Sequence, residues 1–575
     1  MRTLDARHLD QLDRSTRRRF RKDSDSQAFE PRGERRSGLS TSAEKRFRPV
    51  AVLRADVEIS VLGCSRIRPE FGSRYGMSEI ATVRQVLPIR RNSHLIVSAR
   101  TRESALHPWT AADSTTRPEE SQWRNSGLRA DCRLKVCPMI SQPASPTTSV
   151  SPSSEFRHPG KGARVAIVGA GVIGAASAHY LAEAGCSVVL LDRGNFGKAC
   201  SHGNCGYVSP SHILPLCKPG AVSASLRTLF QRNSPFKIRP RLDYHTWSWF
   251  LKFALRCNYK DMIQAGHARH AMLMSSRQLF QDMMTAGKLG NCEWETKGLL
   301  FVHHDPHHFE LFAKINELLV NEYGLGAKRY DADELLKLEP ALKPVVAGAW
   351  LYECDAHLRP HLLMDSFHQL LIQQGVEIRE NCEFLDLETS SNQAKRLKTS
   401  QGDIEVDHVI FATGAWSRLL QQKLKTRIPI EPGKGYSITM PRPALCPAYP
   451  MIFEDHRVAI TPTAGAYRIG STMEFAGFDS TLREDRLSLL TNGAKFYLQD
   501  PLAEPVIEKW WGWRPMSCDG VPLVGRVPKY DNVWLAAGHS MLGLSMATAT
   551  GKLLMEMLTG ATPHIDPRPY RLDRF

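Results

Sequence analysis

The sequence predicts an α/β protein in which a βαβ unit is joined to a second, discontinuous α+β domain. Three observations support this prediction. Residues 164–192 have the pattern of a strand, a glycine turn, a helix and a second strand. Two further blocks, 404–417 and 532–544, each run from a strand into a turn of small residues. Residues 428–440 and 458–475 have the pattern of strands in a separate sheet. Segments of the two domains therefore alternate along the chain.

The βαβ unit carries a glycine pattern typical of dinucleotide binding. Gly169-x-Gly171-x-x-Gly174 follows an apolar run and opens an alanine-rich helical stretch. The first glycine permits a tight turn, the second lets a pyrophosphate approach the backbone, and the third lets helix and strand pack closely. Backbone N–H groups at the helix start, around Val172 and Ile173, and the positive end of the helix dipole favour phosphate.

An acidic residue follows at the end of the second strand. Asp192 lies 18 residues after Gly174, where a carboxylate can accept hydrogen bonds from ribose hydroxyls. The complete pattern predicts that an adenine dinucleotide binds here, with Asp192 beside the ribose and Arg193 as a further cofactor-binding residue. An ordinary glycine turn in an α/β domain is the alternative, and the pattern alone does not distinguish FAD from NAD.

Three further loops are expected to face the same ligand. Residues 197–207 are rich in glycine and small residues and directly follow the strand that ends at Asp192, so they lie at the ligand edge of a parallel sheet. The turns after the two later strands allow close backbone approach, and the final one precedes a helical pattern whose dipole could stabilise negative charge. The candidate residues of these loops are Ser201, Asn204, Ala412, Thr413, Gly414, Trp416, Gly538, Gly543 and Leu544.

Positive charge is concentrated before the part that looks folded. Residues 1–160 carry 29 basic and 18 acidic residues, whereas residues 161–575 carry 46 and 41. Residues 141–154, SQPASPTTSVSPSS, have the composition of a linker, which buries too little apolar surface to offset the entropy of ordering. We expect a disordered extension over 1–160. In this interpretation the extension could be non-native, with Met139 as the natural start. The alternatives are a basic arm for nucleic acid or an anionic membrane, and a targeting segment.

Other compositional features exclude several classes. The 13 cysteines form no CxxC pairs, so neither a zinc site nor a disulfide framework is expected, and a reducing compartment is favoured. His303, His304, His307 and His308 flank a turn signal and match no metal-ligand spacing, so we interpret them as a solvated turn. No run of 18 apolar residues and no signal-peptide core occur. A cytoplasmic location is expected, and no nucleic-acid partner is expected for the catalytic part.

Residues 245–257 have the periodicity of an amphipathic helix. An aromatic stripe at this spacing is more often part of a core than of a cofactor site, so we interpret it as a packing face. Its members are Trp247, Phe250, Leu251, Ala254 and Leu255.

Five motifs occur in order along the chain: VGAGVIG at 168–174, ACSHGNCG at 199–206, FATGAWS at 411–417, GWRPMSCDGVPLVG at 512–525 and AAGHSMLGLSMA at 536–547. Together they resemble the D-amino-acid oxidase-like superfamily of FAD-dependent oxidoreductases, and most closely its bacterial D-amino-acid dehydrogenases. The resemblance covers about residues 163–570 and implies FAD rather than NAD, bound to a Rossmann-like domain of glutathione-reductase type beside an antiparallel-sheet substrate domain. Asp192 stands where the family often has Glu, so its role is carried over with a shorter arm.

The resemblance also implies how the domains alternate. The FAD-binding domain is expected to comprise residues 161–215, 351–425 and 509–575. The substrate domain is expected to comprise residues 216–350 and 426–508. By the same likeness, the C-terminal glycine turn lies against the pyrimidine edge of the flavin.

Arg514 is the candidate substrate-binding residue. The family's Gly-x-Arg-Pro motif reads GWRP at 512–515, and a guanidinium can bind the planar carboxylate of an α-amino acid through two parallel hydrogen bonds. A structural or surface arginine is the alternative. In relatives a tyrosine often closes the far side of the substrate, and Tyr467 and Tyr436 are candidates here. His539 could contact the flavin or substrate, or simply pack beside its turn.

The expected reaction is oxidative deamination of a D-amino acid. Arg514 would hold the carboxylate so that the Cα–H faces flavin N5, and positioning would supply much of the catalysis. No cysteine replaces Arg514, so non-covalent FAD is expected, although Cys518 lies near in sequence. Glycine, sarcosine or a D-hydroxyproline could be the substrate instead, and a quinone or oxygen could be the acceptor. Peripheral association with the inner face of the cytoplasmic membrane is left open. From another class, the chain could be a binding protein that uses a basic arm on an FAD-fold scaffold.

Overall fold

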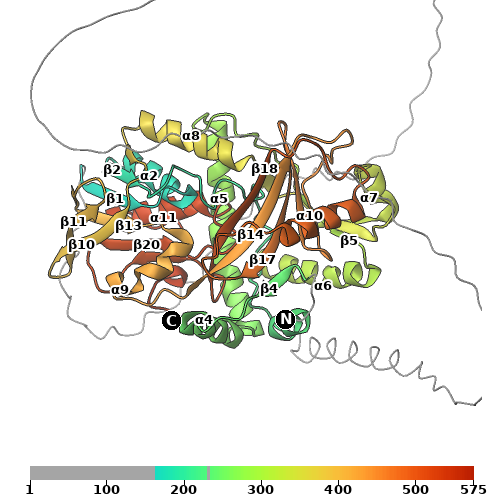
Figure 1. Ribbon diagram of the computed structural model, residues 1–575, viewed down its shortest axis with the longest axis horizontal. Coiled ribbons are helices and arrows are strands. Elements are labelled where there is room, and N and C mark those ends of the chain that lie inside the picture. The colour runs from blue at the N-terminus through green and yellow to red at the C-terminus, as the bar shows by residue number, and fades with distance from the viewer. Residues whose placement is uncertain (1–161, 230–233) are drawn as a thin grey trace, which may run out of the picture. The chain divides into compact units, whose positions relative to one another are not determined.

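Two β-sheets dominate the computed structural model, which describes residues 162–229 and 234–575 (Figure 1). The first sheet has six strands in the order β19-β20-β13-β1-β2-β9. The second has nine strands in the order β18-β14-β17-β16-β15-β5-β7-β6, with β4 added beside β17. The expected extension over 1–160 and its linker lie outside the described residues.

The six-stranded sheet is the expected dinucleotide-binding sheet, and the α/β prediction is confirmed. Its strands are parallel except for β19, which pairs antiparallel with β20 at one edge. Strands covered on both faces are apolar throughout rather than alternating, as Val165 to Val168 of β1 show. The strands are β1 (Arg164–Val168), β2 (Ser187–Leu191), β9 (Glu377–Arg379), β13 (His408–Phe411), β19 (Leu523–Arg526) and β20 (Val533–Ala537).

Helices cover one face of this sheet and a three-stranded sheet, β10-β11-β12, contributes to the core on the other. Small residues bring the central helices into backbone contact, because a Cβ on Gly551 of α11 would lie 2.6 Å from the carbonyl of Ala176 in α2. The elements of these layers are α2 (Val172–Glu183), α5 (Tyr259–Thr285), α8 (Pro360–Gln373), α11 (Ala547–Thr559), β10 (Phe384–Ser390), β11 (Gln393–Thr399) and β12 (Ile404–Glu405).

The nine-stranded sheet is mainly antiparallel, and β14 is paired on both sides by β17 and β18. Helices α7 and α10 share one hydrophobic core with its strands, and α6 packs near β5 and β7. The elements are β4 (Phe236–Ile238), β5 (Leu299–His303), α6 (Pro306–Tyr323), β6 (Lys328–Asp331), α7 (Ala332–Leu338), β7 (Gly348–Tyr352), β14 (Ile430–Met440), β15 (Met451–Phe453), β16 (Val458–Pro462), β17 (Tyr467–Phe475), α10 (Glu484–Tyr497) and β18 (Glu508–Ser517).

Two elements join the sheet or core of a different domain from the one to which the expected division of the chain assigns them. Strand β18 falls in the expected FAD segment 509–575, but it pairs with β14 from Glu508 to Ser517 in the second sheet. Helix α5 falls in the expected substrate segment 216–350, but its buried face, including Met272 and Leu273, joins the core beneath the first sheet. We keep the alternating division as a proposal with these two elements exchanged.

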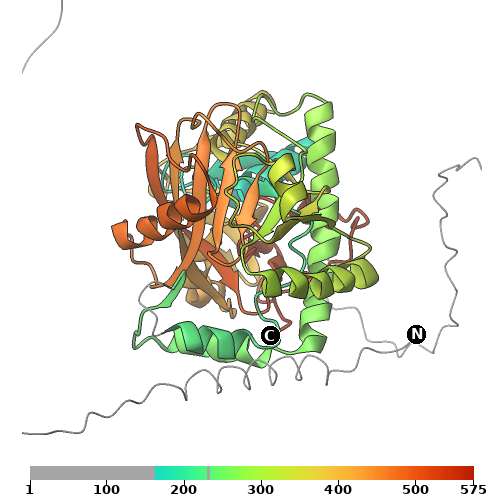
Figure 2. The same ribbon diagram turned by 90° about the vertical axis from the view of Figure 1, so that its right-hand side faces the viewer.

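Helix α4 (Tyr244–Leu255) does not bury the face that its periodicity suggested. Trp247, Leu251 and Leu255 are 53%, 62% and 69% exposed, and the ring of Trp249 instead stacks on Phe253. Ala254 is exposed as well. The packing interpretation is therefore wrong for these four residues, because α4 is apolar on more than one face and periodicity cannot select the buried one. Figures 1 and 2 show α4 across the lower end of the long helix α5.

The four histidines near residue 305 differ in their exposure to solvent. His303 ends β5 and is buried, so the interpretation as a solvated turn is wrong for this residue. His304, His307 and His308 are exposed, and Asp305 caps α6 by accepting a hydrogen bond from the His307 N–H at 2.8 Å. Within the described part of the chain, every helix is too short or too polar to cross a membrane.

Candidate active site

A cavity of about 2380 Å³ is lined by residues of both sheets. Ordinary small-molecule pockets have volumes of roughly 300–1,000 Å³. The larger space suits an extended ligand such as a dinucleotide together with a second, smaller molecule. The predicted cofactor residues line this cavity with the exception of Gly174 and Gly538.

The glycine turn after β1 forms a close-packed cradle at one end of the cavity. Gly169 has a φ of +110°, and a Cβ there would lie 2.6 Å from the carbonyl oxygen of Ala412. A Cβ on Gly174 would lie 1.9 Å from the carbonyl oxygen of Gly169. These glycines therefore let the turn, the start of α2 and the end of β13 meet backbone to backbone, which is the geometry that a pyrophosphate site requires.

The start of α2 is open toward the cavity. Gly171 is the N-cap and has no side chain to cap the helix, while Val172 and Ile173 line the cavity. The Val172 N–H donates to Ser201 Oγ at 2.9 Å, which leaves the serine hydroxyl hydrogen for another acceptor. First-turn N–H groups lack partners within their helix, so this end of α2 can bind phosphate.

Asp192 supports the turn as well as lining the cavity. Its Oδ2 accepts from the Ala170 N–H and its Oδ1 from the Gly194 N–H, both at 2.9 Å. The guanidinium of Arg193 lies 4.5 Å from the ring centroid of Trp416, a cation–π contact. Two loops that are far apart in sequence thus meet at the place expected for the ribose.

The other predicted loop residues have more varied positions. Asn204 donates to the carbonyl oxygens of Cys200 and Ser201 and accepts from the Gly206 N–H, so its amide holds the loop together rather than pointing to a ligand. Thr413 Oγ1 lies 2.8 Å from Ser417 Oγ. Gly538 has a φ of +80° in the turn after β20. Ala412, Gly414, Gly543 and Leu544 line the cavity.

Arg514 is a partly buried cation on the wall formed by the second sheet. Its Nη1 donates to the Thr472 carbonyl oxygen at 2.8 Å, and no carboxylate of the described residues pairs with it. Burial lowers the pKa of the guanidinium, and the nearby thiols of Cys205 and Cys200 oppose this shift. A partly buried positive charge with unused donors on a cavity wall is a site for an anion.

The two candidate tyrosines are separated by the fold. Tyr436 lines the cavity, and its hydroxyl donates to Glu474 Oε2 at 2.8 Å. Tyr467 is fully buried in the core shared with α10 and does not line the cavity. It lies five residues from Thr472 along β17, so strand geometry holds it away from Arg514.

His539 lines the cavity as a neutral side chain. It is buried, and its Nε2 lies 3.0 Å from Thr550 Oγ1. Burial lowers the pKa of His539 to about 3, so it carries no positive charge near neutral pH. It can exchange hydrogen bonds but cannot neutralise an anion.

Sequence reasoning missed the residues that surround Arg514. Thr472 supplies its hydrogen-bond acceptor, and Gly435 lies beneath its guanidinium. The Gly433-x-Gly435 pair in β14 is a signal for a close approach, but its meaning depends on the register between strands. His212 was missed as well; it lines the cavity, and burial lowers its pKa to about 4.

Comparison with known proteins agrees with this geometry. Residues 164–557 match the family of FAD dependent oxidoreductases, abbreviated DAO. The match covers more than half of the chain, and the chain belongs to this family. Membership favours an enzyme over a binding protein on an FAD-fold scaffold. The predicted resemblance is thereby confirmed, and the protein is an FAD-dependent oxidoreductase.

The chain is also similar to individual curated proteins and solved structures. A D-amino acid dehydrogenase of Granulibacter bethesdensis is 30% identical over 428 residues, which cover 72% of this chain and 99% of the relative. A D-amino acid dehydrogenase of Paramagnetospirillum magneticum is 30% identical over 427 residues, with the same coverage of both chains. The fold is similar to that of glycine oxidase from Bacillus cereus, with a TM-score of 0.57 at 21% identity over 72% of this chain and 99% of that one.

The residues present fit FAD. The cradle at Gly169 and Gly174 would be filled by any Cβ, the start of α2 offers N–H groups, and Asp192 lies at the end of β2. The cavity continues from this cradle to Arg514. One continuous space therefore joins the site for a dinucleotide to the site for an anion.

Proposed function

We propose that this enzyme oxidises the Cα–N bond of D-amino acids, with Arg514 binding the substrate carboxylate. The observation that carries the proposal is the partly buried guanidinium of Arg514, which lines the cavity and has no carboxylate partner among the described residues. Two relatives named D-amino acid dehydrogenase, each of which this chain covers almost completely, support the substrate class. Glycine, sarcosine and D-hydroxyproline remain alternatives, because all present a carboxylate beside an amine.

In this proposal the protein binds and orients both reactants. FAD, when bound non-covalently, supplies a two-electron acceptor. The backbone around Gly169, Gly171 and the start of α2 would hold its pyrophosphate, and Asp192 its ribose. Arg514 would fix the carboxylate through two parallel hydrogen bonds. Oxidation of a neutral amine at Cα yields an imino acid, which water hydrolyses to a keto acid and ammonia.

The proposal assigns no proton transfer to a protein base. His539 is neutral and engaged with Thr550, and the hydroxyl of Tyr436 is engaged with Glu474. Holding two reactants in one geometry can itself supply a large part of a rate enhancement. The residues around Arg514 therefore act by positioning and by excluding water.

Replacing Arg514 tests the proposal. In Arg514→Ala the flavin should remain bound, while kcat/KM for D-amino acids falls by about 30-fold or more, because truncating one partner of a buried charge pair costs about 2–5 kcal/mol. The measurement is anaerobic titration with D-amino acids, L-amino acids, glycine, sarcosine and D-hydroxyproline while the flavin absorbance is followed. Arg568→Ala, at a side chain that is 81% exposed, is the matched control and should behave as wild type.

Two results would overturn this assignment. A colourless Arg514→Ala protein without flavin would place Arg514 at the cofactor instead. Unchanged reduction by D-amino acids in that variant would show that the carboxylate binds elsewhere. Reduction of the wild-type flavin by L-amino acids alone would reverse the proposed stereochemistry.

We further propose that the electron acceptor is a quinone taken from the surface of a membrane. Helices α4 and α3 (Ala221–Leu229) both contribute residues to the lining of the cavity. Leu226, Trp247 and Leu251 line the cavity and are also 58%, 53% and 62% exposed, so apolar surface continues from the exterior into the cavity. Such helices with basic neighbours, here Lys252 and Lys260, are typical of attachment to anionic bilayers.

Vesicle flotation tests the acceptor proposal. Wild-type enzyme should float with phosphatidylglycerol-containing vesicles and reduce a quinone faster than oxygen. Leu251→Gln should weaken flotation, whereas Leu445→Gln, at a side chain that is 40% exposed and outside the cavity lining, should not. Equal flotation of both variants, or rapid hydrogen peroxide formation without quinone reduction, would contradict the proposal and favour oxygen.

A further inference from the structure

Arg514 lies over a stretch of sheet in which glycines provide no side chains. Gly433 of β14 is paired with Arg514 of β18, and Gly435 is paired with Gly512. Paired residues of antiparallel strands project from the same face, so these glycines and the arginine share one surface. A Cβ on Gly435 would lie 2.2 to 2.3 Å from the guanidinium carbon and nitrogens of Arg514. The guanidinium therefore occupies the space that a side chain at residue 435 would fill.

The strand on the other side of Gly435 is bulged at the same level. The register of β17 against β14 shifts between Lys434↔Glu474 and Tyr436↔Ser471. Within the shift, Ser471 and Thr472 have φ values of +115° and +52°, which non-glycine residues rarely adopt. A bulge of this kind redirects backbone groups. Here the carbonyl of Thr472 accepts the hydrogen bond from Arg514 Nη1.

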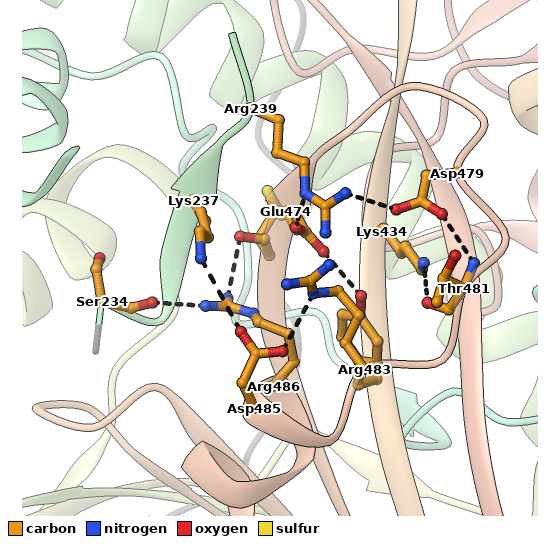
Figure 3. A network of polar contacts seen from close by, with 12 residues as sticks. Ser234, Lys237, Arg239, Lys434, Glu474, Asp479, Thr481, Arg483, Asp485 and Arg486 are labelled. Carbon is orange, nitrogen blue, oxygen red and sulfur yellow. Dashed lines mark hydrogen bonds and ion pairs between the residues drawn. The ribbon is translucent and has the colours of Figure 1, made fainter. Parts of the chain in front are cut away.

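A network of charged side chains holds the chain directly after the bulge (Figure 3). The buried carboxylate of Glu474 accepts from Arg239 Nε at 2.7 Å and from the Tyr436 hydroxyl at 2.8 Å. Buried Arg486 donates to the carbonyl oxygens of Ser234 at 2.8 Å and Pro235 at 2.6 Å. Strained backbone of this kind persists only where surrounding contacts determine it. The network supplies such contacts to the residues that follow the bulge.

We propose that Gly435 and the clamped bulge at Thr472 are positioning elements for Arg514. The missing side chain lets the guanidinium lie against β14, and the Thr472 carbonyl engages one end of the fork. The remaining donors are thereby held in one orientation for a carboxylate in the cavity. This inference rests on the proposed function, in which Arg514 binds that carboxylate. Because the guanidinium is held before substrate arrives, carboxylate affinity should depend on residue 435.

A double-mutant cycle between Gly435→Ala and Arg514→Lys tests the inference. Gly435→Ala should raise KM for a D-amino acid roughly 10- to 100-fold, the loss expected when hydrogen bonds to a charged group are misaligned, with kcat and flavin content changed much less. In the Arg514→Lys background the same substitution should raise KM less than about 3-fold, because the three nearest atoms to the new Cβ are then absent. Propionate, which carries the carboxylate without the amine, should show the same pattern in direct titrations of the flavin spectrum.

Gly433→Ala is the matched control on the same strand and face. Its Cβ would approach Met516 Cγ at 2.8 Å, and its three nearest atoms include none from Arg514. KM should therefore stay within about 3-fold of wild type, since no donor to the carboxylate is displaced. An increase in KM as large as that of Gly435→Ala would assign the effect to disturbance of the sheet and overturn the inference.

The remaining outcomes also decide between explanations. Equal effects of Gly435→Ala in both backgrounds overturn the positioning role while leaving carboxylate binding by Arg514 intact. An unchanged KM in Arg514→Lys alone overturns the proposed role of Arg514 and this inference with it. If Gly435→Ala does not fold, Tyr436→Phe decides, because it removes one donor to Glu474 without adding bulk. Tyr436→Phe should raise KM only when Arg514 is present. An unchanged KM, or an equal increase in the Arg514→Lys background, contradicts the inference.

Discussion

Glycine shapes the two walls of the cavity in different ways. The cofactor wall is formed by the glycine turn after β1 and the start of α2, and the substrate wall by β14, β17 and β18. On the cofactor wall, Gly174 lets backbone meet backbone, since a Cβ there would lie 1.9 Å from the Gly169 carbonyl oxygen. On the substrate wall, Gly435 and Gly470 make room for side chains, those of Arg514 and Cys205. A collision with backbone cannot be relieved by choosing another rotamer, whereas a collision with a side chain can be relieved in part. Substitutions on the cofactor wall should therefore cost more.

Gly174→Ala should have the largest effect. The new methyl group would push the start of α2 away from the glycine turn, which separates the N–H groups that bind the pyrophosphate. We expect the purified variant to contain almost no flavin, measured as flavin absorbance per protein, and to unfold at a lower temperature. Gly290→Ala is the control, because its Cβ would meet the Ser366 hydroxyl at 3.3 Å. Full flavin content in Gly174→Ala would contradict the expectation that substitutions on the cofactor wall cost more than those on the substrate wall.

Asp355 anchors a loop whose residues line the cavity. It is fully buried and accepts hydrogen bonds from the Ser211 N–H at 3.0 Å and from Ser211 Oγ at 2.5 Å. Ser209, Ser211 and His212 of that loop line the cavity. Burial raises the pKa of Asp355 to about 7 from its ordinary value near 3.8. The folded protein therefore favours the protonated carboxyl.

This raised pKa predicts a pH-dependent stability. Between pH 4 and about pH 7 the folded state binds a proton that the unfolded state has released, so stability falls as pH rises, by at most about 1.4 kcal/mol per pH unit. Above the folded pKa the penalty is constant. Asp355→Asn should flatten this part of the profile, because the amide does not titrate and can still accept from the Ser211 N–H. Urea unfolding of both proteins across this range measures the slope, and identical slopes would assign the titration to another group.

The difference between the walls explains which parts of the site the sequence could predict. The residues from Gly169 to Arg193 form one continuous βαβ unit, so spacing alone places them together. Arg514 was found through a motif, but Gly435 and Thr472 acquire their roles only from the pairing of β14, β17 and β18. Register also decides between the tyrosines, because Tyr436 faces the bulge while Tyr467 lies further along the strand. No local pattern encodes these long-range pairings.

The outcome for α4 has a related cause. Trp247 and Trp249 are two residues apart and lie on different sides of the helix. Both sides are apolar, so the periodicity fits either as the packing face. The ring contacts of Trp249 with Phe253 and Phe475 show which side is buried. When a helix is apolar on two sides, sequence periodicity can therefore assign to the core a side that is exposed in the structure.

Gly470→Ala should have the smallest effect and sharpens the contrast with Gly174. The new Cβ would lie 2.6 Å from Cys205 Sγ and 3.4 Å from Ser437 Cβ, so rotation of the thiol relieves most of the overlap. We expect full flavin content and a loss of about 1 kcal/mol in the free energy of unfolding, at the low end for overpacking. In Cys205→Ala, where the thiol is absent, adding Gly470→Ala should cost less than it does alone, which urea unfolding can measure as a coupling energy. Loss of flavin in Gly470→Ala would mean that the loop at 199–206 moves as a rigid unit, so that the substrate wall tolerates bulk no better than the cofactor wall.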